Sequence, residues 1–230
     1  KMYRSVDQGR SWITVELTGY YILDPAVCDY SGQYCLLMAG IVNTGDRYLM
    51  FSEDYGNTWT SILSSISGEP TLSNFDISKD GTAIYAVKNI TVTNCEVVRS
   101  LDHGQTWNSL LILNNSNLYI HAGYNGDIIL QDDHSAICKV YISSDYGTTF
   151  TLKDRVVISA VGKFYMDING TIYAISDDRE SIFRGDTYFD TNIQASSFPI
   201  TTNGFSVTND GANIAIATDS RLYLSRDMGS

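Results

Sequence analysis

Long apolar runs are missing from this sequence. No run of about 18 apolar residues occurs, so no segment is expected to span a membrane, and no signal peptide is visible. No segment sustains a helical period, and only three prolines interrupt the 230 residues. The sequence therefore predicts an all-β protein that folds as a single domain over residues 1–230.

Positive charge is also scarce. Fifteen Lys and Arg face 26 Asp and Glu, which gives a net charge of −11. Phosphate backbones need a basic surface, so we expect no nucleic-acid partner, and no anionic membrane as a partner either. A basic protein, a cation or a neutral glycan remains open as a partner, and solubility alone also accounts for the charge.

Cysteine and histidine are few, at four and three residues. No Cys-x-x-Cys pattern is present and the histidines lack metal-ligand spacing, so the sequence predicts neither a metal site nor a cofactor. Cys28 and Cys35 flank the turn Ser31-Gly32 symmetrically and should face each other across a hairpin. Such a pair is within disulfide reach but the geometry is demanding, so the bridge stays open.

A short motif, Ser-x-Asp-x-Gly-x-Ser/Thr-Trp/Phe, occurs five times. Successive motif serines are 47, 48, 43 and 82 residues apart, the last interval being two units of 41 around one degenerate copy. The positions are Ser5, Asp7, Gly9 and Trp12; Ser52, Asp54, Gly56 and Trp59; Ser100, Asp102, Gly104 and Trp107; Ser143, Asp145, Gly147 and Phe150; and, in a truncated copy, Ser225, Asp227 and Gly229. Such a period predicts a repeat architecture.

The residue types in the motif favour a tight turn. Gly opens the left-handed region, while Asp and Ser accept hydrogen bonds from nearby backbone amides. The aromatic residue begins the next strand and should bury its ring beneath the turn. We therefore expect the carboxylates to serve the backbone; metal binding or catalysis is the alternative.

A second turn type runs in phase with the first. Gly32, Gly81, Gly126, Gly170 and Gly211 lie between apolar runs, at intervals of 49, 45, 44 and 41 residues. Asn-Gly and Asp-Gly turns are strong hairpin signals. Two turn types with one period predict four antiparallel strands per unit, which is the size of a β-propeller blade.

The number of blades follows from the strand count. The chain begins and ends in strands of the third type, so Trp12 to Val15 could supply the fourth strand of the last unit and close five blades. A surplus third strand keeps two alternatives open: a fragment of a six- or seven-bladed ring, or strand exchange between chains. The degenerate copy should fall near residues 181–188, as a blade whose turn has eroded.

The motif resembles the Asp-box, the bacterial neuraminidase repeat of sialidases, sortilin-type receptors, some xyloglucan-cleaving glycosidases and photosystem-II assembly propellers. The resemblance covers nearly the whole chain and implies a propeller, with the boxes between third and fourth strands and away from any catalytic centre. It does not imply an activity. Sialidases also carry Phe/Tyr-Arg-Ile-Pro, and here Tyr3-Arg4-Ser5-Val6 departs from it after two residues.

Acidic loops between second and third strands should emerge on the face opposite the boxes. Their candidate binding residues are Asp46, Asp132, Asp133, His134, Asp177, Asp178, Glu180 and Asp219. We expect a non-catalytic scaffold that binds protein or glycan there, as a monomer or a strand-exchanged oligomer. The alternatives are a glycoside hydrolase, either sialidase-like or with two carboxylates at the pore mouth, a structural or engineered repeat without a ligand, or acidic loops that simply face water.

Overall fold

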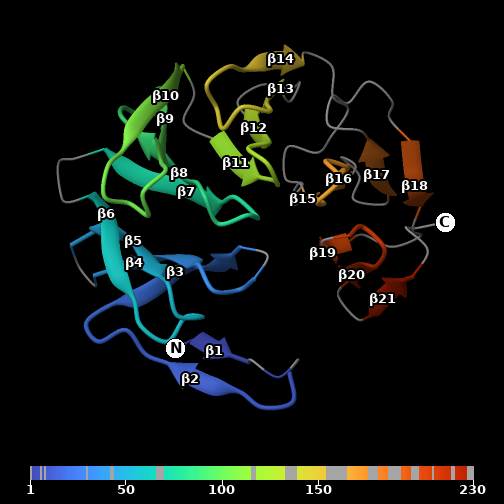
Figure 1. The fold of residues 1–230 in the computed structure, drawn as a ribbon, viewed down its shortest axis with the longest axis horizontal. Helices are drawn as coiled ribbons and strands as arrows, with labels where there is room; N and C mark the ends of the chain where they lie inside the picture. The colour runs from blue at the N-terminus through green and yellow to red at the C-terminus, as the bar shows by residue number, and fades with distance from the viewer. Residues whose placement is uncertain are drawn as a thin grey trace. The chain divides into compact units, whose positions relative to one another are not determined.

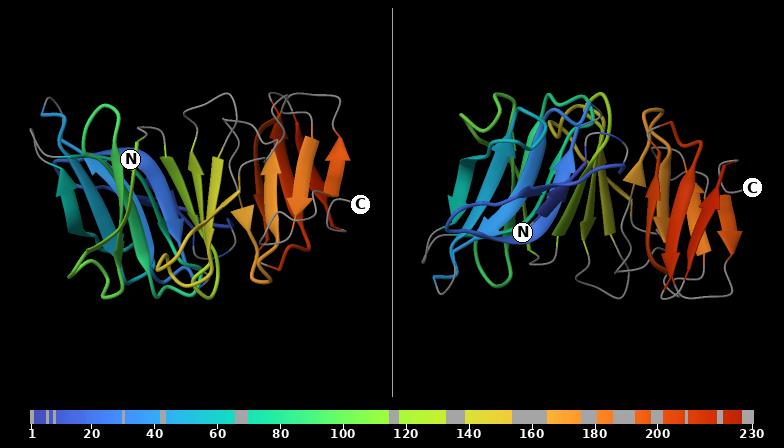
Figure 2. Two further views of the ribbon diagram at one scale, coloured as in Figure 1. Left: turned by 90° about the horizontal axis from the view of Figure 1, so that it is seen from above. Right: turned by 90° about the horizontal axis from the view of Figure 1, so that it is seen from below.

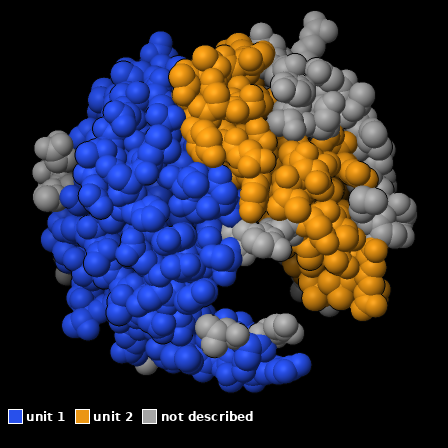
Figure 3. Space-filling model, in the orientation of Figure 1, with its two compact units in different colours: residues 1–116 blue, residues 117–230 orange. Residues whose placement is uncertain are grey.

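The structure is a computed structural model of the chain, and every described element in it is a β-strand. It describes all residues except 1, 6, 8, 30, 42–43, 66–69, 115–117, 133–138, 154–164, 176–180, 186–192, 198–201, 209, 219–220 and 227–230. Among the described residues there is no helix that could cross a membrane. The chain divides into two compact units, Lys1–Ser116 and Asn117–Ser230 (Figure 3).

The strands are short and follow one another along the chain (Figure 1). Unit 1 holds β1 (Met2–Arg4), β2 (Ile13–Val15), β3 (Tyr21–Cys28), β4 (Cys35–Gly40), β5 (Arg47–Ser52), β6 (Thr60–Ser65), β7 (Thr71–Ile77), β8 (Ile84–Asn89), β9 (Cys95–Ser100) and β10 (Asn108–Leu113). Unit 2 holds β11 (Leu118–Ala122), β12 (Ile128–Asp132), β13 (Lys139–Ser143), β14 (Thr151–Lys153), β15 (Tyr165–Met166), β16 (Ile172–Ile175), β17 (Ser181–Gly185), β18 (Ile193–Ser197), β19 (Thr202–Val207), β20 (Ile214–Thr218) and β21 (Leu222–Ser225).

Each sheet is an antiparallel meander of sequential strands (Figure 2). Unit 1 contains the pair β1-β2 and the sheets β3–β6 and β7–β10, and unit 2 contains β11–β14, β15–β18 and the three described strands β19–β21. The five sheets that follow the pair β1-β2 are the five blades of a β-propeller, the predicted fold class. Sequential pairing of this kind needs only short turns, which the periodic glycines supply.

Apolar side chains on the facing sides of consecutive blades form the core. In unit 1, Leu36, Leu49 and Phe51 of one blade pack with Ile84 and Val98 of the next. In unit 2, separate clusters join β11–β14 to β15–β18, and β15–β18 to β19–β21. A fully buried Leu or Ile contributes roughly 1.5–3 kcal/mol, so these layers between blades supply most of the stabilisation.

The predicted register at the first hairpin is confirmed, because Cys28 pairs with Cys35. Cys35 forms a disulfide. The turn is longer than the two residues expected from Ser31-Gly32. The last backbone hydrogen bond before it runs from the Asp29 amide to Tyr34 O, at 2.9 Å. The Asp29 carboxylate also accepts the Tyr34 amide at 3.0 Å, which stabilises the wider loop.

Two expectations about the strands need correction. The strand at Trp12 to Val15 was expected to complete the last blade, but β2 pairs with β1 in the register Met2–Val15. Antiparallel pairing across its own box turn is local and costs little chain entropy. The degenerate copy of the motif begins later than residue 181. In the preceding blade the motif serine Ser143 pairs with Ile128, and here Gly185, the last residue of β17, makes the equivalent pair with Ile172. Gly185 therefore stands at the position of the motif serine.

Candidate functional site

The repeated motif builds one hydrogen-bonded turn, seen most completely between β5 and β6. The Ser52 hydroxyl donates to Asp54 Oδ1 at 2.8 Å and accepts the Gly56 amide at 2.8 Å. Asp54 Oδ1 accepts the Thr58 amide at 2.8 Å, and Oδ2 accepts the Thr58 hydroxyl at 2.7 Å. Asp7, Asp102 and Asp145 accept the same pair of bonds from Ser11, Thr106 and Thr149.

These bonds hold the box carboxylates in their ionised form. The pKa of each of the four, Asp7, Asp54, Asp102 and Asp145, is lowered to about 2, and the largest cause is hydrogen bonding from the residue four positions later. A carboxylate with this pKa and with both oxygens occupied is a poor general base. The motif in these four copies therefore orders the backbone.

The residue before the box glycine adopts an unusual backbone conformation. Tyr55, His103 and Tyr146 have φ of 60°, 55° and 58°, in the left-handed region that non-glycine residues rarely enter. The Tyr55 amide donates to Gln33 O at 3.1 Å, across to the turn between the first and second strands of its blade. The Tyr146 amide makes the same bond to the corresponding turn of its own blade, at 2.9 Å. Both turns therefore lie at one end of the blade, which we call the box end.

The opposite end carries the loops between second and third strands, and we call it the box-distal surface. The loop at residues 90–94 is described in full, and that at residues 41–46 is described except for residues 42–43. In the first, the Thr44 hydroxyl accepts the Asp46 amide at 3.2 Å, and Asp46 is 9% exposed. Burial, and then the Asp46 charge, raise the pKa of Tyr48.

The predicted acidic residues are not brought together by the described structure. Asp46 lies in unit 1, and Asp132 ends β12 in unit 2, level with Leu118 and Lys139 on its two neighbouring strands. Asp133, His134, Asp177, Asp178, Glu180 and Asp219 lie outside the described residues, as do Asp227 and Gly229 of the last box. Within the described ranges, no group of three or more His, Cys, Asp or Glu could hold a metal ion.

The loop between β8 and β9 was not predicted as a site, yet it presents apolar side chains. Val92 is 89% exposed and Ile90 is 40% exposed. The loop is held by the Thr91 hydroxyl, which accepts the amides of Thr93 and Asn94 at 3.2 and 2.9 Å, and by the Ile90 amide bonded to Asn94 O at 2.9 Å. The sequence signal is a valine between two threonines, which reads equally well as strand.

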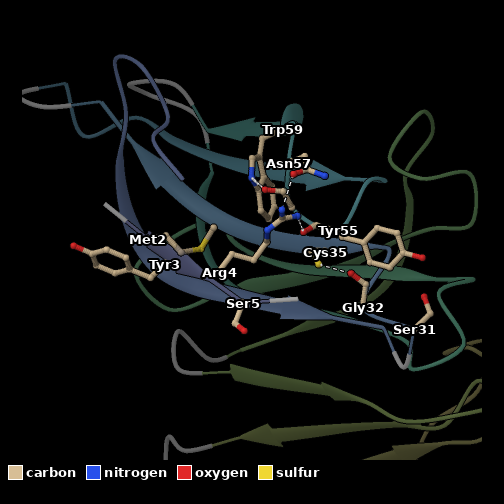
Figure 4. Close-up of a pocket in the computed structure, with 11 residues that line it drawn as sticks. Met2, Tyr3, Arg4, Ser5, Ser31, Gly32, Cys35, Tyr55, Asn57 and Trp59 are labelled. Atoms are coloured by element: carbon tan, nitrogen blue, oxygen red, sulfur yellow. Dashed lines mark hydrogen bonds between the residues drawn. The ribbon is translucent and has the colours of Figure 1, made fainter. Parts of the chain in front are cut away.

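A cavity of about 670 Å³ lies at the box end of unit 1, beside β1 (Figure 4). Arg4 projects along it, and its Nη atoms donate to Tyr55 O and, at 2.6 Å, to Asn57 Oδ1. Arg4 Nε is buried and has no hydrogen-bond partner. Trp59 and Cys35 also line the cavity.

A second hollow, about 660 Å³, lies between the boxes of the first two blades. His103, in the motif of the second blade, is one-third exposed. Its ring lies 4.8 Å from the Tyr34 ring and 5.3 Å from the Phe51 ring, and its Nδ1 lies 3.2 Å from Glu53 Oε1. Two rings of the preceding blade therefore cover part of the His103 ring.

No family model and no curated protein matches this chain. It is similar in structure to YCF48 from Cyanidioschyzon merolae, with a TM-score of 0.63, 13% identity, and coverage of 94% of this chain and 71% of that one. The GH74 enzyme of Niastella koreensis gives a TM-score of 0.67 and 14% identity, with 99% of this chain and 41% of that chain covered. TolB from Acinetobacter baumannii gives a TM-score of 0.66 and 13% identity, with 97% of this chain and 56% of that chain covered.

The chain thus spans less than two thirds of the last two of these proteins. Identities of 13% and 14% establish a common fold and leave activity open. The comparisons and the five blades agree that this chain has the β-propeller fold.

Proposed function

We propose that this chain is a non-catalytic propeller that binds a protein partner through its box-distal surface. Glycan is the second ligand class, to be distinguished by the test below. The motif is proposed to be an Asp-box, which the repeated Ser–Asp–Gly hydrogen bonding of the four described copies supports. In this proposal the boxes are structural and the opposite loops make the contacts.

The observation that carries the proposal is the loop at residues 90–94. Val92 is 89% exposed on a hydrogen-bonded turn. Because the loop is already ordered, a partner that binds there loses little conformational entropy of the loop. Apolar patches rimmed by polar residues mark protein contact sites, and Ile90, 40% exposed, adds a second apolar side chain to the same loop. Val92 stands among Thr91, Thr93 and Asn94 and therefore fits the centre of such a contact.

Charge indicates the kind of partner. The net charge of −11 attracts basic surfaces and speeds their encounter at low salt. The proposed acidic contacts are Asp46, Asp132, Asp133, His134, Asp177, Asp178, Glu180 and Asp219, with the histidine as a polar member. A partner with a basic surface and an apolar contact would suit both the loops and Val92.

The test is a binding screen with two arms, a display library of basic peptides and a printed glycan array. Peptide binders should lose about tenfold or more in affinity on Val92→Asp, which corresponds to about 1.4 kcal/mol. The matched control is Ile112→Asp, because Ile112 is 58% exposed on β10 of the same blade, outside the loop. Binders equally sensitive to both changes, or to neither, would contradict the assignment of the surface.

A glycan ligand would appear in the second arm, with binding that depends on Val92 or on Asp46. The rival function, a glycoside hydrolase, predicts turnover of an oligosaccharide panel and its loss on replacement of one carboxyl of a pair. Turnover of any glycoside would overturn the non-catalytic proposal, whatever the peptide screen gives.

A further inference from the structure

The junction between the box of the N-terminal hairpin and the box of the first blade contains an arginine side chain. Arg4 stands directly before the hairpin's box, and its Nη atoms donate to Tyr55 O and, at 2.6 Å, to Asn57 Oδ1 in the next box (Figure 4). A backbone carbonyl and a side-chain carbonyl of one box thus form a pair of acceptors. A planar guanidinium, with its fork of N–H groups, fits such a pair.

The next junction, between the boxes of the first and second blades, repeats the acceptors without the arginine. Phe51 stands at the arginine's position, and His103 and Gln105 follow at the positions of the two acceptor residues. His103 has φ of 55°, close to the 60° of Tyr55, so the two turns present this carbonyl alike. Among the described residues, no donor takes the arginine's place at the His103 carbonyl.

This second junction opens into the hollow of about 660 Å³ between the two boxes. Phe51, His103 and Gln105 line the hollow, together with Ile62 and Glu53. Phe51 and Ile62 offer apolar surface, which suits the methylene stem of an arginine side chain. Both blades lie in unit 1, and each of them has all four of its strands.

Glu53 adds a negative charge that the first junction lacks, since the sequence has Val6 at the equivalent position. The Glu53 side chain is 64% exposed, and its Oε1 lies 3.2 Å from His103 Nδ1. A carboxylate has about four lone-pair sites, so this one contact leaves room for further donors. None of the ion pairs among the described residues joins Glu53 to a Lys or Arg. The hollow therefore combines the acceptors of a guanidinium site with a carboxylate.

We propose that the hollow between the boxes of the first and second blades binds an arginine side chain of a partner polypeptide. The guanidinium donates to His103 O and to Gln105 Oε1, as Arg4 does to the preceding pair of acceptors, and it pairs with the Glu53 carboxylate. The net charge of −11 favours the approach of such a side chain. The site lies at the box end, so it does not depend on the proposed box-distal surface.

The experiment titrates the whole isotope-labelled chain with N-acetyl-arginine methylamide and follows the amide resonances of Glu53, His103 and Gln105 by NMR. We expect saturable shifts of these three amides with a dissociation constant of about a millimolar, because a single side chain makes few contacts. The blocked lysine should bind about fivefold more weakly, because an ammonium lacks the planar fork of donors. Methylguanidinium should bind about threefold more weakly, because it lacks the stem that packs on Ile62.

Two pairs of variants locate the site. Glu53→Gln should weaken binding of the arginine probe about fivefold, whereas Asp24→Asn, which removes the same charge from an exposed position on β3 of that blade, should not. Ser61→Arg places a tethered guanidinium at the hollow and should abolish binding of the probe. Ser109→Arg is its control, because Ser109 holds the equivalent exposed position on β10, and it should leave the affinity nearly unchanged.

Several results would overturn the proposal. They are the absence of saturation at about 50 mM probe, equal affinities for the arginine and lysine probes, or equal losses in Glu53→Gln and Asp24→Asn. Methylguanidinium that binds as tightly as blocked arginine would also overturn it, because the site would then recognise a free ion rather than a side chain. Val92→Asp should leave the affinity for the arginine probe unchanged, so this test and the test of the box-distal surface can fail separately.

Discussion

The N-terminal hairpin and the second blade carry the same motif in different surroundings. Asp7 and Asp102 accept the same amide and hydroxyl bonds, each at 2.8 and 2.6 Å. The aromatic residues that follow differ, because Trp12 is 62% exposed while Trp107 is half-buried and packed against the core between blades. The motif thus closes its own turn, and burial of its ring depends on the neighbouring blade.

In the second blade, Ile62 of the preceding blade packs against the motif and helps to bury the Trp107 ring. Its carbonyl accepts Trp107 Nε1 at 3.3 Å, and its side chain fills the space beside Gly104. Near Gly9 an added Cβ would meet only Trp12, at 3.8 Å. The residues of one repeat therefore determine the turn. The packing of the preceding repeat determines how much stability is lost when a residue of that turn is replaced.

The largest expected effect that separates the two regions comes from Gly104→Ala and Gly9→Ala. Both glycines have positive φ, +89° and +83°, so both changes strain the backbone by about 1 kcal/mol. At Gly104 the new Cβ would also lie 2.5 Å from Ile62 Cβ, so we expect a total of about 3 kcal/mol there. Urea denaturation measures the free energy of unfolding; equal losses would mean that the blades do not pack as described.

The next effect comes from the rings themselves. Trp107→Ala should lower the free energy of unfolding by about 2–3 kcal/mol, because it removes core packing and the bonds from Nε1 to Gly104 O and Ile62 O. Trp12→Ala, at an exposed site, should cost under about 0.5 kcal/mol. A large loss at Trp12 would indicate that a further strand or partner covers the hairpin in solution.

The sequence was sufficient for the fold because the turns repeat. Gly32 and Gly81 lie in turns of the same type at the box end, and Cys28 pairs with Cys35 as the symmetric spacing predicted. The role expected for the box carboxylates matches the bonds that Asp54 accepts from the Thr58 amide and hydroxyl. All of these are local relations that a few neighbouring residues determine.

Relations between repeats were harder to predict. The strand at residues 13–15 has the right sequence for a fourth strand of any blade, so its pairing with β1 was not decided by its residues. The contacts of His103 with Tyr34 and Phe51 of the preceding blade likewise do not follow from its own motif. The acidic site residues stay a prediction, because most lie outside the described ranges and Asp46 and Asp132 belong to different units.

The smallest expected effect tests where the two regions agree. The pKa of Asp7 and of Asp102 is lowered from 3.8 to about 2, chiefly by the hydroxyls of Ser11 and Thr106. A depressed pKa stabilises the folded state above pH 3.8, and that stability is lost as the pH falls through about 2. Between these values unfolding should take up protons, and either Asp7→Asn or Asp102→Asn should reduce the uptake by about one proton.

The two reductions should be equal, because each carboxylate is held by its own turn and neither bond involves the neighbouring blade. The measurement is the slope of the free energy of unfolding against pH between about 2 and 4, from urea melts of the parent and the two variants. A reduction at Asp102 without one at Asp7 would show that the box in the hairpin closes only when a blade packs on it. The exposure of Trp12 and the open turn would then both result from the missing neighbouring blade. The motif would in that case not close its turn by its own hydrogen bonds alone.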